Sequence, residues 1–123
     1  MLARALNARN LDAAASCFAK DACLITPDAT AIRGRARIRA VLAQLIARRA
    51  QIEIELSCVL MAVDVALVRE RWTIGSDGIE GSRFEQSCST TLVLRLIEDE
   101  WRLAIAAPWG NGDQMLARQL GAR

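Results

Sequence analysis

The 123-residue sequence contains no histidine and no tyrosine. Histidine is the side chain whose ordinary pKa lies closest to neutral pH, and it is also the most common metal ligand. Its absence excludes a histidine-based catalytic triad and a histidine metal site. Proton transfer near neutral pH would therefore depend on aspartate, glutamate, one of the four cysteines or the single lysine, Lys20.

Closely spaced cysteines, a large excess of charge and long apolar runs are also missing. The four cysteines form no C-x-x-C pair, which argues against a zinc site and a disulfide framework. A formal net charge of +2 is too close to balance to indicate nucleic-acid binding. The most apolar window, residues 58–68, is too short to span a membrane and contains Asp64. We therefore expect no metal, no cofactor, no nucleic-acid partner and no membrane partner.

The length and a hydrophobic content of 53% are typical of one globular domain. We predict that this domain covers residues 1–110 and that residues 111–123 form a tail, part of which is a short helix. The N-terminal residues lack the apolar core and the cleavage site of a secretory signal, so we expect a cytoplasmic protein.

Residues 21–45 predict a strand, a turn, a second strand and a helix. Residues 23–26 are apolar and partly β-branched, Pro27 and Asp28 are turn formers, and residues 31–33 can return as a strand. Gly34 then opens a helix with an apolar face. That face consists of Ile38, Val41, Leu42, Leu45 and Ile46.

Two shorter helices are predicted before this stretch. The first includes Leu2 and Leu6. Asn10 is a good N-cap for the second, which we extend through Phe18 to residues 21–22. After the longer helix, four strands are predicted over residues 51–63, 65–74, 83–97 and 101–107.

Alternation predicts which side chains of the later strands share a face. The strand over residues 65–74 places Glu70 and Trp72 on the same face as two smaller apolar residues, Ala66 and Val68. The last strand places Trp101, Leu103 and Ile105 on one face. We expect both faces to point toward the helices.

The sequence resembles the NTF2-like superfamily, in its SnoaL-like and ketosteroid-isomerase-like branch. The resemblance rests on the order "DA…P-D…G-x-x-x-I" after residue 20, on DVALVRERWTI at 64–74 and on TTLVLRLIEDEWRLAIA at 90–106. It covers residues 2–109. It implies an α+β fold, in which three N-terminal helices pack on a strongly curved, mostly antiparallel sheet to form a cone with an internal cavity. It also implies a homodimer.

The catalytic residues of the ketosteroid isomerases are not present at the corresponding positions. The resemblance places the general base immediately before the proline and an oxyanion-stabilising tyrosine on the first helix. Here these positions are Thr26 and Leu2. Neither side chain can perform the corresponding step, so we do not expect this isomerase mechanism.

The cone cavity is predicted to be largely apolar, because the end of the last strand is aliphatic. Thr26 would offer a hydroxyl group to a ligand. The other predicted lining residues are Phe18, Ile38, Leu42, Trp72, Ile105 and Trp109.

Two carboxylates are candidates for catalysis. Glu70 is predicted to point inward, where desolvation would favour the protonated acid and suit it to general acid–base chemistry. The alternative is an ion pair with Arg83 or Arg95 across the sheet. Asp28 would lie at the cavity mouth, or simply in a solvated turn.

Three functions remain open at this stage. The first is binding of a small apolar or aromatic molecule in the cone, without a specified reaction. The second is an isomerase, cyclase or hydratase that uses Glu70 or Asp28. The third is an association module whose product is the dimer itself, because the apolar segment 58–61 suits an interface.

Overall fold

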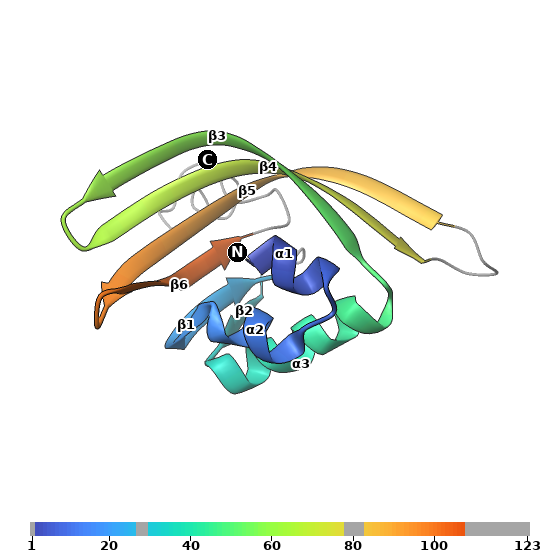
Figure 1. The fold of residues 1–123 in the computed structure, drawn as a ribbon, viewed down its shortest axis with the longest axis horizontal. Helices are drawn as coiled ribbons and strands as arrows, with labels where there is room; N and C mark the ends of the chain where they lie inside the picture. Colours follow the sequence, from blue (N-terminus) through green and yellow to red (C-terminus); the bar gives the residue numbers. More distant parts are fainter. Residues whose placement is uncertain (1, 27–29, 78–82, 108–123) are drawn as a thin grey trace.

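The structure is a computed structural model that describes residues 2–26, 30–77 and 83–107 (Figure 1). Asp28, Trp109 and the tail predicted over residues 111–123 lie outside these residues. The described helices are α1 (Leu2–Asn7), α2 (Leu11–Ser16) and α3 (Arg35–Ala47). The strands are β1 (Phe18–Ile25), β2 (Ala31–Arg33), β3 (Gln51–Ala62), β4 (Val65–Asp77), β5 (Arg83–Ile97) and β6 (Glu100–Ala107).

The predicted α+β class and the curved sheet are confirmed. The six described strands form one sheet in the order β2-β1-β6-β5-β4-β3, and every neighbouring pair is antiparallel except β1 and β6. The three helices lie together on one side of the sheet (Figure 1). We call the side of the sheet toward the helices the inner face and the opposite side the outer face.

The helix boundaries follow from local chemistry. The Asn10 side chain accepts a hydrogen bond from the backbone N–H of Ala13 at 3.1 Å and caps α2 as predicted. Gly34 precedes α3 with φ of 91°, a backbone conformation that favours glycine. Ile38 and Leu42 of α3 are buried against the sheet, as their helical spacing predicts.

The predicted extension of the second helix to residue 22 is wrong. Helix α2 ends at Ser16, and residues 18–25 form β1. Pairing with a distant strand overrides the local preference, because Phe18 lies beside Leu103 of β6 and the Leu103 N–H donates to the Cys17 carbonyl at 2.7 Å. Phe18 is nevertheless fully buried, as the sequence predicts.

The placement of Ile105 on the inner face is also wrong. Along β5 and β6, Leu94 pairs with Leu103, but Val93 pairs with Ile105, so that β6 carries one extra residue, Ala104, at this point. Such a β-bulge shifts the alternation of the strand by one position. Ile105 therefore lies on the outer face, 45% exposed, and Ala106 takes the inner position, where it is buried.

The buried core lies between the helices and the inner face. Its fully buried large side chains are Phe18, Ile38, Leu103 and Leu6. The described residues include no helix long and apolar enough to cross a membrane.

The turn between β5 and β6 yields a prediction about stability. Glu98 and Asp99 have φ angles of 50° and 65°, and a two-residue hairpin turn with two positive φ angles favours glycine at its second position. We expect Asp99→Gly to raise the free energy of unfolding by about 0.5–1 kcal/mol, because the left-handed strain that it removes is larger than the cost of the added entropy of the unfolded chain. Urea denaturation followed by circular dichroism measures the change.

The hairpin turn between β3 and β4 supplies the control. Asp64, between β3 and β4, has no positive φ, so Asp64→Gly only increases the entropy of the unfolded chain and should leave stability unchanged or slightly lower. An equal gain from both substitutions would show that backbone strain at Asp99 is not the cause.

Candidate functional site

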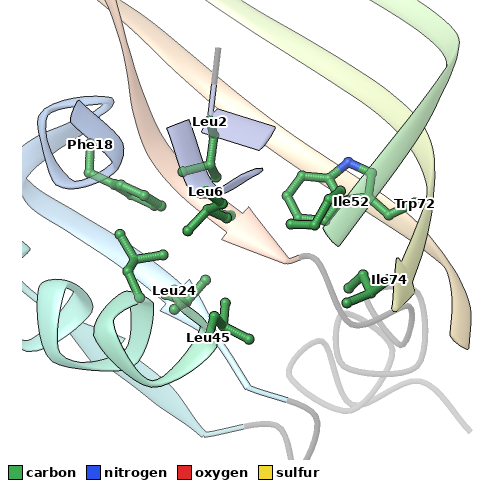
Figure 2. A pocket seen from close by; sticks show the side chains of 10 residues that line it. Leu2, Leu6, Phe18, Leu24, Leu45, Ile52, Trp72 and Ile74 are labelled. Carbon is green, nitrogen blue, oxygen red and sulfur yellow. The ribbon is translucent and has the colours of Figure 1, made fainter. Parts of the chain in front are cut away.

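The candidate site is a cavity between α1, α3 and the inner face of the sheet (Figure 2). Phe18 lies on one side of it and Trp72 on the other, with Leu2 and Leu6 of α1 between them (Figure 2). Every lining side chain among the described residues is apolar. These residues are Leu2, Leu6, Phe18, Leu24, Leu42, Leu45, Ile52, Trp72, Ile74 and Ala106.

Helix α1 is tied to the sheet by one polar contact beside the cavity. The Asn7 side chain donates to the Ile52 carbonyl at 2.9 Å and accepts from the Ile52 N–H at 2.7 Å. This pair of hydrogen bonds holds α1 next to the first residues of β3. It thereby directs Leu2 and Leu6, which are one helical turn apart, into the cavity.

The side chains nearly fill the cavity. The space open to the centre of a water-sized sphere is about 20 Å³, whereas the total space between the walls, including the solvent at the mouth, is about 410 Å³. The smaller volume is the one that decides what fits, and it corresponds to about one water molecule. A ligand larger than that requires side chains of the wall to move.

Apart from Ile105 on the outer face and Trp109 outside the described residues, the structure places the predicted lining residues in three groups. Phe18, Leu42 and Trp72 line the cavity. Ile38 is fully buried in the core beside it but is not part of the wall. Thr26, at the end of β1, uses its hydroxyl group locally, in hydrogen bonds with the N–H and the carbonyl of Thr30 at 3.1 Å.

Several wall residues were not predicted. Leu2 and Leu6 are the most important of these, because α1 closes one side of the cavity. Their spacing of four residues was the available signal. Ile52 and Ile74 face each other across β3 and β4, and their inward position follows from the same alternation that placed Trp72. Ala106 was missed because of the bulge in β6.

Glu70 lies on the inner face next to the cavity wall. It is half-buried, and its Oε1 accepts a hydrogen bond from the Trp72 indole Nε1–H at 2.9 Å. The predicted alternative of an ion pair with Arg95 is wrong, because Arg95 binds Asp21 at 2.6 Å. The Arg83 side chain lies outside the described residues. Glu70 is thus a carboxylate oriented by the same tryptophan whose ring lines the cavity.

Two further polar side chains continue this part of the inner face on β5. Thr90 is paired with Glu70 across the two strands and is fully buried, and Cys88 is paired with Trp72. Burial raises the pKa of the Cys88 thiol, and its contact with the Thr90 hydroxyl lowers it by less. Cys88 therefore stays a neutral thiol at physiological pH. Within the described ranges, no group of three or more metal-binding side chains lies together.

The fold is the cystatin-like fold of NTF2-like proteins. Within that class, the sequence pattern of the SnoaL-like domain matches residues 1–116, so the chain belongs to the SnoaL-like domain family. A comparison with curated proteins finds no match.

Solved structures of similar fold come from several bacteria. A ketosteroid isomerase-like protein from Erwinia carotovora atroseptica is 18% identical, with a TM-score of 0.76 over 86% of this chain and 85% of that one. A proposed dehydratase of the NTF2-like family from Streptomyces avermitilis is 21% identical, with a TM-score of 0.71 over 85% and 86%. An NTF2-like protein with a cystatin-like fold from Novosphingobium aromaticivorans is 15% identical, with a TM-score of 0.71 over 85% and 71%. Identities this low establish the shared fold alone.

The packing of α1 into the cavity leads to a prediction about stability. Leu6 is 2% exposed and lines the cavity wall, so Leu6→Ala removes buried contacts and enlarges a void. We expect a loss of about 3 kcal/mol in the free energy of unfolding. Urea denaturation of the purified variant measures this loss.

Leu56 provides the matched control, because it is 60% exposed at the sheet edge. Leu56→Ala should change the free energy of unfolding by less than about 0.5 kcal/mol. Equal losses for the two variants would mean that α1 does not pack as the structure shows.

Proposed function

We propose that this protein binds a small apolar molecule in the cavity of the cone. The observation that carries this proposal is the composition of the wall, to which the described part of the chain contributes ten apolar side chains and no polar one. A ligand there would be stabilised by removal of its apolar surface from water, at about 25 cal/mol per Å². The Trp72 ring adds a flat surface against which an aromatic ring can pack.

The small volume of the cavity limits the size of the ligand, unless side chains of the wall move. Helix α1 is the part of the wall that can move at least cost, because it has only six residues and its hydrogen bonds to the sheet come from Asn7. Displacement of Leu2 and Leu6 would open the cavity without breaking the sheet. We therefore propose that the ligand is no larger than one or two fused rings.

Catalysis by Glu70 is the second candidate function. It is favoured by the hydrogen bond that orients this half-buried carboxylate beside the cavity wall and by the similarity of the fold to a proposed dehydratase. A general base needs to reach its substrate. Glu70 is not part of the cavity wall, but it is hydrogen-bonded to Trp72, which is. Asp28 remains a candidate for the same role outside the described residues.

Native mass spectrometry of the freshly purified protein, compared with its denatured mass, tests ligand binding directly. We expect a retained small apolar molecule. Leu45→Phe adds bulk to the wall at a half-buried position and should reduce the retained fraction at least about tenfold, because the added atoms occupy the ligand's space.

Ile46→Phe is the matched control, since Ile46 is the adjacent half-buried residue of α3 and does not line the cavity. It should retain the ligand as the unmodified protein does. Equal retention by the Leu45 and Ile46 variants would place the ligand elsewhere and contradict the proposal.

Glu70→Gln separates binding from catalysis. The amide keeps a side-chain oxygen that can accept the hydrogen bond from Trp72 but cannot act as a general base at neutral pH. If the protein only binds, the variant should retain the same ligand in the same amount. If Glu70 catalyses a hydration or a dehydration, the mass of the retained molecule should shift by that of one water molecule between product and substrate. An isomerisation leaves the mass unchanged but alters the chromatographic retention of the released molecule. Either change would make the second candidate replace the first.

A further inference from the structure

The charges of the chain are divided unevenly between the helical layer and the sheet. Residues 1–49, which contain the three described helices, carry nine basic and three acidic residues, whereas residues 50–123 carry seven basic and eleven acidic ones. The two parts therefore have formal net charges of +6 and −4, which the overall value of +2 hides. A division of this kind indicates a surface for anionic groups in the basic part.

The basic excess centres on α3. Residues 29–52 contain six arginines and no acidic residue. Two of these arginines have partners inside the protein. Arg35 donates to the Phe18 carbonyl at 2.9 Å, and Arg39 forms an ion pair with Asp12 of α2 at 2.5 Å. These two side chains therefore serve the packing of the helical layer.

Arg37 and Arg48 form a basic edge on the other side of α3. Successive residues of an α-helix are turned by about 100°, so Arg37 and Arg39 flank the buried Ile38 on opposite sides. Arg39 points toward α2, and Arg37 points away from it. Arg48 follows Arg37 by about three turns and lies on the same side, about 16 Å further along the axis. Both residues are exposed, and neither has an acidic partner in the described part of the chain.

The stability of the isolated protein does not account for Arg37. This residue stands in the first turn of α3, where the helix dipole disfavours a cation, and that turn contains no acidic residue. Loss of the positive charge should therefore stabilise the free protein. The same charge becomes favourable when an anionic group from outside pairs with it, so its position is explained by binding rather than by folding.

The surface beside this edge has room for a second helix. The exposed residues opposite the buried side of α3 are small, namely Ala36, Ala40 and Ala47. A surface helix usually carries polar side chains there. Because these side chains end at the β-carbon, the axis of another helix can approach to about 8–10 Å.

Two other classes of anionic partner fit this surface less well. The described helices expose no large apolar side chain, so they lack the groups that insert into the boundary of a lipid bilayer. They also contain no aromatic residue on which the bases of a nucleic acid could stack. A carboxylate-bearing protein segment requires neither feature.

We propose that the solvent-facing side of α3 binds an acidic helix of a partner protein. Small residues of that helix pack on Ala36, Ala40 and Ala47, and its carboxylates pair with Arg37 and Arg48. Each guanidinium group can bind a carboxylate through two parallel hydrogen bonds. When the two axes are nearly parallel, the separation of the arginines requires carboxylates about eleven residues apart on one side of the partner helix.

Fluorescence anisotropy with labelled model peptides at low ionic strength tests the pattern. The probe is a helical peptide of about 20 residues that contains alanine, glutamine and a stripe of four glutamates at i, i+4, i+7 and i+11. Its control has the same composition, with the glutamates distributed around the helix. We expect the striped peptide to bind at least about fivefold more tightly, since only its carboxylates reach both arginines at once.

Two double variants with the same change in net charge test the location. Arg37→Glu combined with Arg48→Glu should weaken binding of the striped peptide at least about tenfold, because two attractions become repulsions. Arg69→Glu combined with Arg71→Glu, at exposed positions on the outer face of β4, should leave the affinity unchanged. A striped peptide with lysines in place of its glutamates should bind the first double variant and not the unmodified protein.

Urea denaturation of each variant verifies folding and supplies a second readout. Arg37→Glu alone should unfold at a higher urea concentration than the unmodified protein, because an acidic residue in the first turn of α3 suits the helix dipole. A less stable variant would show that Arg37 serves the fold and would overturn the proposal.

Three binding results would also overturn it. They are equal affinity for the striped and the control peptide, equal losses in the two double variants, and tighter binding of another polyanion through Arg37 and Arg48. The polyanions compared are a short DNA duplex and vesicles of phosphatidylcholine with phosphatidylglycerol. The proposal is independent of ligand binding in the cone, because neither arginine lines the inner cavity.

Discussion

The pairing of Phe18 with Leu103 joins the helical layer to the sheet. The two residues are partners in the parallel pair of β1 and β6, and both side chains are fully buried. The Arg35 side chain at the start of α3 donates to the Phe18 carbonyl through Nε at 2.9 Å, which ties the longest helix to the same point. Phe18 also forms one side of the cavity. The position of α3 and of that cavity wall therefore depends on a contact between residues far apart in the sequence.

The sequence predicts the elements that depend on local periodicity. Helical spacing identified Ile38 and Leu42 as the buried face of α3, and alternation identified the inward position of Trp72. Prediction from the sequence failed where pairing between distant strands decides the structure. Residues 18–22 have no local signal that distinguishes a helix end from a strand. The face of Ile105 depends on an extra residue in β6, which becomes visible only when β5 is placed beside it.

The same limit applies to the candidate site. The apolar character of the wall could be predicted because it depends on composition and alternation. Its small volume could not, because volume depends on how far Leu2 and Leu6 enter the cavity, and this is set by the hydrogen bonds between Asn7 and Ile52. The spacing of Glu70 and Trp72 predicted that both lie on one face. The hydrogen bond by which the Trp72 indole orients Glu70 could not be predicted from the sequence.

The two faces of the sheet form two different surfaces. Side chains alternate between these faces along each strand, which keeps the two surfaces separate. Along β4, Trp72 faces the inner cavity, whereas Leu67 points to the outer face. Helix α1, which closes one side of the cavity, lies on the side of the sheet opposite the outer face (Figure 1). Strand β4 contributes to both faces, and a one-residue change in its register with β3 and β5 would exchange the residues of the inner face with those of the outer face.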